Sequence, residues 1–120
     1  MARAKITGKL GEEIALHYLI KKGFQLLAVN WRWKHLEIDL IGIHDGKLVI
    51  LEVKTRKNAD FGDPASFVSG KQQRNLITAA NRFLEIHALS LEVRFDIVAI
   101  LHEEKSYSIT HIQDAFQPGV

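Results

Sequence analysis

The stretch that decides the fold is residues 37–54, EIDLIGIHDGKLVILEVK. Residues 37–41 and 48–54 are rich in apolar β-formers and predict two strands. The Asp45-Gly46 dipeptide between them is a strong signal for a two-residue hairpin turn. If His44 and Lys47 close that turn, the numbers of opposed residues sum to 91, and Asp39 faces Glu52 across the hairpin.

Four charged side chains then share one face of the hairpin, because side chains alternate between the two faces of a strand. They are Glu37, Asp39, Glu52 and Lys54. Directly opposed residues have Cβ atoms about 4.5–5.5 Å apart, so the carboxylates of Asp39 and Glu52 would repel each other. A divalent cation would turn that repulsion into a binding site. The simpler interpretation is a surface ladder of salt bridges, but Ile41 and Ile50 on the same face favour the mouth of a cleft.

Length and composition limit the classes of protein to consider. With 120 residues the chain is expected to form a single domain over residues 1–120. It has no cysteine, which excludes disulfides and thiolate metal sites and suits a cytoplasmic protein. No apolar run reaches the ~20 residues of a membrane span, and residues 1–6 show no signal peptide, so no membrane association is expected. The 16 basic residues nearly balance the 14 acidic ones, which permits nucleic-acid binding without requiring it.

The rest of the chain predicts an α/β domain. The expected elements are a helix at 8–22, strands at 24–33, 37–41 and 48–54, a loop at 57–67, a helix at 70–87, and strands at 91–101 and 106–112. Gly23 suits the end of the first helix, and Ser69 with Gln72 fits a capping box that opens the second. The order α-β-β-β-α-β-β predicts a mixed central sheet flanked by helices. Continuous apolar runs at 48–53 and 97–101 predict strands that are buried on both faces.

Three acidic residues outside the hairpin, Glu12, Glu13 and Asp96, lie in segments that are otherwise apolar or helical. At helical spacing Glu12 shares a stripe with the apolar residues at i+3, i+4 and i+7, whereas Glu13 lies on the solvated face. A carboxylate on a packing face needs a partner, which could be a metal or a reactive water, or else a cap or a lysine. Asp96 interrupts an apolar strand and is expected to be a satisfied structural acid. No pair among the six histidines has zinc-ligand spacing, and no phosphate-binding glycine loop is present.

Basic residues occur in three groups that could contact a nucleic-acid backbone. They are Arg32 and Lys34 in and after the first strand, Arg56 and Lys57 after the hairpin, and Lys71 and Arg74 at the start of the second helix. Free N–H groups at a helix start attract phosphate, and nearby cations add to that attraction. Each group also has a simpler interpretation as a solvated rim. Trp31 and Trp33 could stack on bases, but alternation along a strand favours packing inward.

Seven short motifs follow one another along the chain. They are Gly8-x-x-Gly11-Glu12-x-x-Ala15, Asn30-Trp31-Arg32, Glu37-Ile38-Asp39-Leu40-Ile41, Glu52-Val53-Lys54-x-Arg56, Lys71-x-x-Arg74, Arg94-Phe95-Asp96-Ile97-Val98 and His111-Ile112-x-x-Ala115-Phe116. As an ordered set they resemble the YraN-like family, over about residues 5–116. That largely uncharacterised family is assigned a restriction-endonuclease-like fold. The hairpin is more distantly similar to PD-(D/E)XK nucleases and archaeal Holliday-junction resolvases.

The resemblance implies an active site and an ion. In the similar nucleases an aspartate on one strand and a Glu-x-Lys on the next bind magnesium and catalyse phosphodiester hydrolysis, and a helix glutamate completes the site. The matching residues here are Glu12, Asp39, Glu52 and Lys54. Our hypothesis is a nuclease acting on DNA, in which Asp39, Glu52 and the Val53 carbonyl hold Mg²⁺, or Mn²⁺ in its place. Glu12 would bind a second ion or orient a water, and a homodimer is expected by analogy with enzymes that cut branched DNA.

One position departs from the family pattern, which usually has glycine just before Glu37, where this chain has Leu36. Leucine tolerates positive φ poorly, so the approach to the strand is expected to differ. Two other functions fit the same residues: a nucleic-acid-binding or adaptor module without catalysis, and a structural protein whose hairpin charges pair off. The first predicts DNA binding that EDTA does not affect, and the second a melting temperature that Mg²⁺ does not change.

Overall fold

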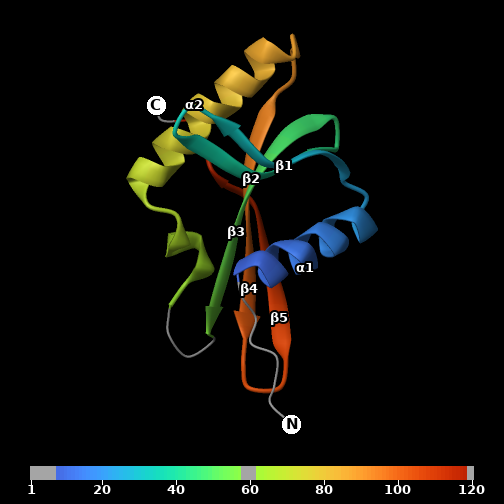
Figure 1. Cartoon of the computed structure of the whole chain (residues 1–120), viewed down its shortest axis with the longest axis vertical. Coiled ribbons are helices and arrows are strands. Elements are labelled where there is room, and N and C mark those ends of the chain that lie inside the picture. Colours follow the sequence, from blue (N-terminus) through green and yellow to red (C-terminus); the bar gives the residue numbers. More distant parts are fainter. Residues whose placement is uncertain (1–7, 58–61, 119–120) are drawn as a thin grey trace.

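The computed structural model describes residues 8–57 and 62–118, which fold into helices and one five-stranded sheet. The elements are α1 (Gly8–Lys21), β1 (Gln25–Trp33), β2 (Leu36–His44), β3 (Lys47–Lys57), the 3₁₀ helix η2 (Pro64–Phe67), α2 (Gly70–Ile86), β4 (Val93–His102) and β5 (Tyr107–Phe116). The strands lie in the order β1-β2-β3-β4-β5, with β3 and β4 parallel and the other neighbours antiparallel. The predicted order of helices and strands and the mixed sheet are confirmed (Figure 1).

The hairpin of β2 and β3 has the predicted register. The paired residues run from Leu40 opposite Leu51 down to the turn, and every pair follows the expected sum. The turn residues have φ values of 52° at Asp45 and 74° at Gly46. This is the left-handed backbone that a type I′ turn requires, and aspartate and glycine adopt it at low cost. The turn therefore fixes which residues face each other near the site.

Each face of the sheet is covered by one α-helix. α1 packs Ala15 and Leu19 into a buried cluster on one face, and α2 packs Ala79 and Phe83 into a second cluster on the other. Residues 48–51 of β3 lie between the two clusters and are at most 1% exposed. The prediction of strands buried on both faces is confirmed for residues 48–52 and 97–100, whereas Val53 and Leu101 are half-buried. No helix in the described part of the chain is long and apolar enough to cross a membrane.

α1 approaches β3 closely at Gly11. A Cβ atom built on Gly11 would lie 2.0 Å from Thr55 Oγ1, which is far inside contact distance. Any larger residue would require the Thr55 side chain, or the helix or the strand, to move. The absence of a side chain at Gly11 thus lets the first turn of α1 lie directly over β3, with Glu12 beside it.

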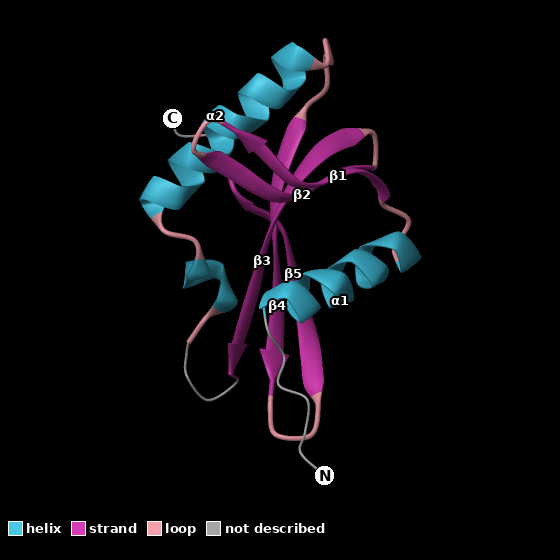
Figure 2. Ribbon diagram, viewed as in Figure 1, coloured by secondary structure: helices cyan, strands magenta, loops and turns pink. Residues whose placement is uncertain are grey.

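β2 and β3 separate after the pair Leu40–Leu51, and we call this point the fork. Beyond the fork β2 continues beside β1 to Leu36, while β3 continues beside β4 from Glu52 to Lys57. Figure 2 shows β3, β4 and β5 running on toward one end of the molecule, while β1 and β2 lie toward the other. The charged residues predicted to face each other therefore lie where two strands diverge.

The segment expected to be a loop at 57–67 contains a short helix. Residues 58–61 lie outside the described residues, and Pro64–Phe67 forms η2. The Asp63 carboxylate accepts a hydrogen bond from the Ala65 N–H at 3.0 Å and so caps the start of η2. Proline directly after this cap is pre-organised for a first helical position.

Two other boundaries differ from expectation. β5 runs to Phe116 instead of ending at residue 112, because a bulge around Asp114, which has a φ of 52°, absorbs a register shift against β4. The expected change in the backbone just before Glu37 occurs at a different residue. The left-handed residue there is Lys34, with a φ of 55°, whereas Leu36 is buried and begins β2. Leucine in place of glycine is therefore accommodated without strain at that residue.

Candidate active site

A cleft of about 690 Å³ lies at the fork. Its acidic lining residues are Glu12 from α1, Glu37 and Asp39 from β2, and Glu52 from β3. Its basic lining residues are Lys54, Arg56 and Lys57, and its other polar side chains are Thr55, Gln72 and His102. All four residues of the predicted active site therefore border one cavity. Its acidic side chains lie at the fork, and its basic side chains lie farther along β3.

Asp39 takes the place of a strand pairing that is missing at the fork. Its Oδ2 atom accepts a hydrogen bond from the Val53 backbone N–H at 2.9 Å. The backbone pairing of β2 with β3 ends one residue earlier, so Asp39 and Glu52 are not a ladder pair. The side chain of Asp39 thereby satisfies an N–H that has lost its strand partner. The same contact fixes the Asp39 carboxylate beside Glu52.

Glu52 is the buried member of this carboxylate pair, with 6% of its surface exposed. Burial, together with a hydrogen bond and charge repulsion from Asp39, raises the pKa of Glu52 from 4.5 to about 9, and Lys54 offsets only part of this rise. Gln72 of α2 donates a hydrogen bond from Nε2 to Glu52 Oε2. Without a cation, the pair of Asp39 and Glu52 therefore holds a proton at neutral pH.

Glu12 reaches the same cleft from α1. It is half-buried whereas Glu13 is exposed, which confirms the prediction about the two faces of the helix. Burial and the charge of Asp39 raise the pKa of Glu12, and a side-chain hydrogen bond from Asn30 lowers it. Glu12 therefore lies within the electrostatic influence of Asp39 at the cleft.

The pair of Asp39 and Glu52 fits a hard divalent cation. Mg²⁺ prefers oxygen ligands, commonly takes one or two carboxylates from the protein, and keeps several waters. Bringing such an ion to the pair would replace the shared proton and remove the repulsion that raises the pKa of Glu52. Within residues 8–57 and 62–118, no three Asp, Glu or His side chains are grouped closely enough to hold an ion together. The oxygen donors that meet at the fork are therefore this pair, with Glu12 nearby.

The basic residues predicted for nucleic-acid contact divide into two sets. Arg56 and Lys57 line the cleft, whereas the other four do not. Lys71 and Arg74 are exposed on α2 on either side of Gln72, whose side chain enters the cleft. Arg56 also donates a hydrogen bond to its neighbouring carbonyl at 2.9 Å, which holds the guanidinium at the strand.

Arg32 and Lys34 are engaged locally. Arg32 forms a salt bridge of 2.6 Å to the cleft residue Glu37, and Lys34 places its Nζ atom 4.5 Å from the centre of the Trp33 ring. Trp31 and Trp33 are partly buried against the α2 side of the core. The prediction that both rings pack inward is confirmed.

Two site residues were not among those predicted, Gln72 and Asn30. Ser69 Oγ accepts the Gln72 backbone N–H at 3.1 Å, as expected, but the Gln72 side chain bonds Glu52. The second half of the predicted capping box is therefore wrong, because a buried carboxylate needs a donor more than an exposed N–H needs an acceptor. The sequence does single out Asn30, because asparagine is depleted in strands and this residue lies within one.

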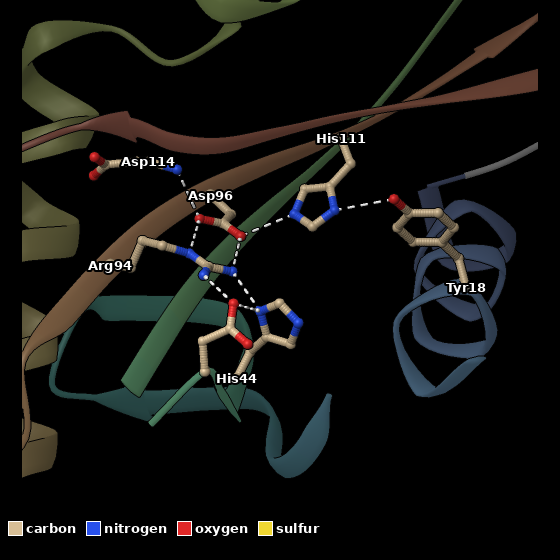
Figure 3. A network of polar contacts seen from close by, with 7 residues as sticks. Tyr18, His44, Arg94, Asp96, His111 and Asp114 are labelled. Atoms are coloured by element: carbon tan, nitrogen blue, oxygen red, sulfur yellow. Dashed lines mark hydrogen bonds and ion pairs between the residues drawn. The ribbon is translucent and has the colours of Figure 1, made fainter. Parts of the chain in front are cut away.

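A second polar cluster lies at the opposite end of β4 and lines no part of the described cleft. Figure 3 shows the fully buried Asp96 accepting two hydrogen bonds of 2.9 Å from Arg94 and one of 3.0 Å from the Asp114 N–H. His111 Nε2 lies 2.8 Å from Asp96, and its Nδ1 lies 3.0 Å from the Tyr18 hydroxyl. Burial alone would raise the pKa of Asp96, but the hydrogen bonds from these partners lower it. The expectation of a satisfied structural acid is confirmed.

Comparison with known proteins assigns the family. The model of the family described as "Uncharacterised protein family UPF0102" matches residues 11–100. The chain belongs to the UPF0102 family. A UPF0102 protein of Flavobacterium psychrophilum is 42% identical over 97% of this chain and 98% of its own length. Corresponding proteins of Christiangramia forsetii and Parabacteroides distasonis are 43% and 39% identical, with at least 96% of each chain covered. This is the YraN-like family that the motifs resemble, and its description names no activity.

Proposed function

We propose that the protein is a metal-dependent endonuclease that hydrolyses phosphodiester bonds in DNA, with branched or structured DNA as one class of substrate. The observation that carries this proposal is the meeting of Asp39 and Glu52 at the fork, in a cleft that is also lined by basic side chains. An acidic pair suits a divalent ion, and a row of cations suits the phosphates of a nucleic acid. The resemblance of the hairpin to the PD-(D/E)XK nucleases supports the same function.

Asp39 and Glu52 would hold Mg²⁺, or Mn²⁺ in vitro, with the Val53 carbonyl as a further oxygen ligand. When bound there, the ion would supply Lewis acidity at the phosphate and a more acidic water. Lys54 lines the same cleft, and its charge lowers the pKa of Glu52 in part. There it would offset the charge that develops on the phosphate or position the attacking water.

The basic side chains of β3 beyond Lys54 would bind the DNA strand that is cut. Both residues line the cleft, and residues along a strand advance about 3.3 Å each, so Arg56 and Lys57 lie farther from the fork than Lys54. Their charges would contact phosphates that flank the scissile one. These contacts predict binding that weakens steeply with salt. Lys71 and Arg74, at the start of α2, would lie farther from the reacting phosphate.

A cleavage screen with matched variants tests this function. The substrates are duplex, single-stranded, flap and four-way DNA, each with Mg²⁺, Mn²⁺ or EDTA. Asp39→Asn is the sharpest variant, because its amide oxygen still accepts the Val53 N–H while one carboxylate is lost from the pair. Loss of metal-held charge stabilisation of several kcal/mol predicts cleavage reduced by about a thousandfold. Glu13→Gln, one residue from Glu12 but exposed, is the control that should cut like the parent.

Two results would overturn the proposal. One is a parent protein that cuts none of these substrates with either ion. The other is an Asp39→Asn variant that cuts as fast as the parent. DNA binding that persists unchanged in EDTA and in Asp39→Asn, without cleavage, would instead support the adaptor function.

A further inference from the structure

The backbone groups of β3 alternate between its two neighbours in the sheet. In a strand, the N–H and C=O groups of one residue point to the same side, and successive residues point to opposite sides. The Leu48 N–H donates at 2.9 Å to the carbonyl of Glu92, which directly precedes β4. The Val53 N–H donates at 2.9 Å to the carboxylate of Asp39, on the opposite side. Even-numbered residues of β3 therefore point toward β4, and odd-numbered residues point away from it.

Beyond the fork, the odd-numbered backbone groups lie on an edge of the sheet, which we call the free edge. The register of β3 with β4 is continuous from Leu48 to Lys57, so no bulge interrupts the alternation. On the side of β3 away from β4, no strand in the described part of the chain pairs with residues 52–57. The N–H groups of Thr55 and Lys57 therefore point outward from the sheet, and both residues line the cleft. Because backbone N–H groups are strong donors, the free edge offers two of them to a ligand in the cleft.

Arg56 makes the free edge better suited to an anion than to a peptide strand. Its guanidinium donates at 2.9 Å to the Thr55 carbonyl, which points to the same side as the Thr55 N–H. The guanidinium carbon also lies 5.7 Å from the centre of the Phe67 ring, a contact that helps to hold Arg56 in place. A peptide strand that joins a sheet needs acceptors as well as donors from the edge, and the acceptor at Thr55 is already engaged. The basic residues Lys54, Arg56 and Lys57 add positive charge around the remaining donors.

The spacing of the two donors matches the backbone of a nucleic acid. Residues two apart along a strand are separated by about 6.6 Å. This separation is close to that of successive phosphates in one extended nucleic-acid strand. The Val53 carbonyl, the proposed further ligand of the ion, points to the same edge. A nucleic-acid strand whose reacting phosphate lies at the ion would therefore bring its next phosphates beside Thr55 and then Lys57.

We propose that the N–H groups of Thr55 and Lys57 form a phosphate track, which holds one strand of the nucleic acid by its backbone. This inference rests on the proposed function, in that the cleft binds a nucleic acid, but it does not require cleavage. Amide donors contact phosphate oxygens and do not read bases. The track therefore sets the path and the register of the strand relative to the acidic pair, and it does not select a sequence.

Hydrogen exchange of single backbone amides tests the track in the parent protein. The probe is a short single-stranded deoxyoligonucleotide, added in EDTA to exclude metal-dependent cleavage. Without the probe, the amides of Thr55 and Lys57 should exchange fast. With the probe at about ten times its Kd, their exchange should slow by about tenfold. The amides of Lys54 and Arg56 are internal controls, because they bond β4 and should exchange slowly throughout.

Thr55→Pro removes the first donor of the track without removing a charge. Proline is tolerated at a sheet edge where the N–H points outward. Thr55→Ala is the reference variant, since it also loses the hydroxyl but keeps the N–H. The Kd for the oligonucleotide should be at least about tenfold higher for Thr55→Pro than for Thr55→Ala, as expected for one hydrogen bond to a charged group. The salt dependence of Kd should be the same in these two variants, whereas Lys57→Gln should lower its logarithmic slope by about one.

Three results would overturn the inference. In the first, the Thr55 and Lys57 amides are protected without the oligonucleotide, so the edge is already paired with a peptide strand. In the second, the oligonucleotide binds but leaves both amides unprotected, so side chains alone hold it. In the third, Thr55→Pro folds and binds as tightly as Thr55→Ala. A parent protein that shows the protection but cuts no DNA would refute the nuclease function and support the track, whereas cleavage without protection would refute the track alone.

Discussion

Replacing Glu52 by glutamine should stabilise the metal-free protein at neutral and alkaline pH. Glu52, whose pKa rises from 4.5 to about 9, keeps its proton in the folded protein at pH 7, whereas the unfolded chain releases it. Folding therefore takes up a proton, and each pH unit above the ordinary pKa costs about 1.4 kcal/mol. At pH 7 the penalty is roughly 3 kcal/mol, which for a domain of this size corresponds to a change in Tm of about 10 °C.

Glutamine suits this test because it has the shape of the protonated acid. Its N–H can donate to Asp39, and its carbonyl can accept from Gln72, so the contacts of Glu52 are kept without a titrating group. Because the folded pKa is raised, the contribution of Glu52 to stability is complete below pH 4.5 and is lost as the pH rises toward about 9. The gain from Glu52→Gln should therefore be large at pH 8 and near zero at pH 4.

The assay is denaturation by guanidinium in EDTA at the two pH values, followed by circular dichroism. Glu13→Gln is the control, since the replacement of an exposed carboxylate should change stability by less than about 0.5 kcal/mol. A variant Glu52→Gln that is no more stable than the parent at pH 8 would refute the reasoning. So would an equal gain at both pH values, because that gain could not come from ionisation.

Three other predictions follow from the site and the core. Binding of Mn²⁺ at pH 8 should release about one proton, because the ion displaces the one that Glu52 retains; calorimetric titrations in two buffers of different ionisation enthalpy count it, and a value near zero would contradict the shared proton. Gly11→Ala should cost about 1–3 kcal/mol, because the added Cβ meets Thr55 Oγ1. The second change Thr55→Ala should restore most of this loss in a denaturation experiment, and no rescue would exclude that contact as the cause. Asp96→Asn should cost about 3–5 kcal/mol at pH 7, since the buried Arg94 loses its nearest counter-charge. The lowered pKa of Asp96 means that its contribution is present above the ordinary carboxyl pKa and lost as the pH falls through the folded value, so the difference from the parent should shrink in acid. Equal differences at pH 7 and pH 3 in thermal melts would contradict this account.

The sequence allowed the hairpin to be predicted because its determinants are local. The Asp45-Gly46 turn and the two-residue alternation together set the register, and that register predicts that Asp39 and Glu52 lie close together. The stripe of Glu12 was predictable for the same reason, since helical spacing is a property of a single turn.

The fork could not be predicted from the sequence, because it depends on how β2 and β3 divide between two neighbours. Two contacts that depend on the fork were therefore not predicted either. Asp39 bonds a backbone N–H instead of standing in a ladder pair, and Gln72 turns from its own helix start to a carboxylate on β3. Both contacts join segments more than ten residues apart, where no periodicity carries information.

Beyond the fork, β3 has a free edge, and this has a consequence for solubility. No other strand of residues 8–57 and 62–118 pairs with that edge from Glu52 to Lys57. An uncovered strand edge can recruit a strand of another molecule and start aggregation, and charged side chains along it oppose this. We therefore expect Lys54, Arg56 and Lys57 to oppose pairing between copies at this edge as well as to line the cleft. A variant that neutralises all three should self-associate, so light scattering must accompany any DNA-binding measurement made with it.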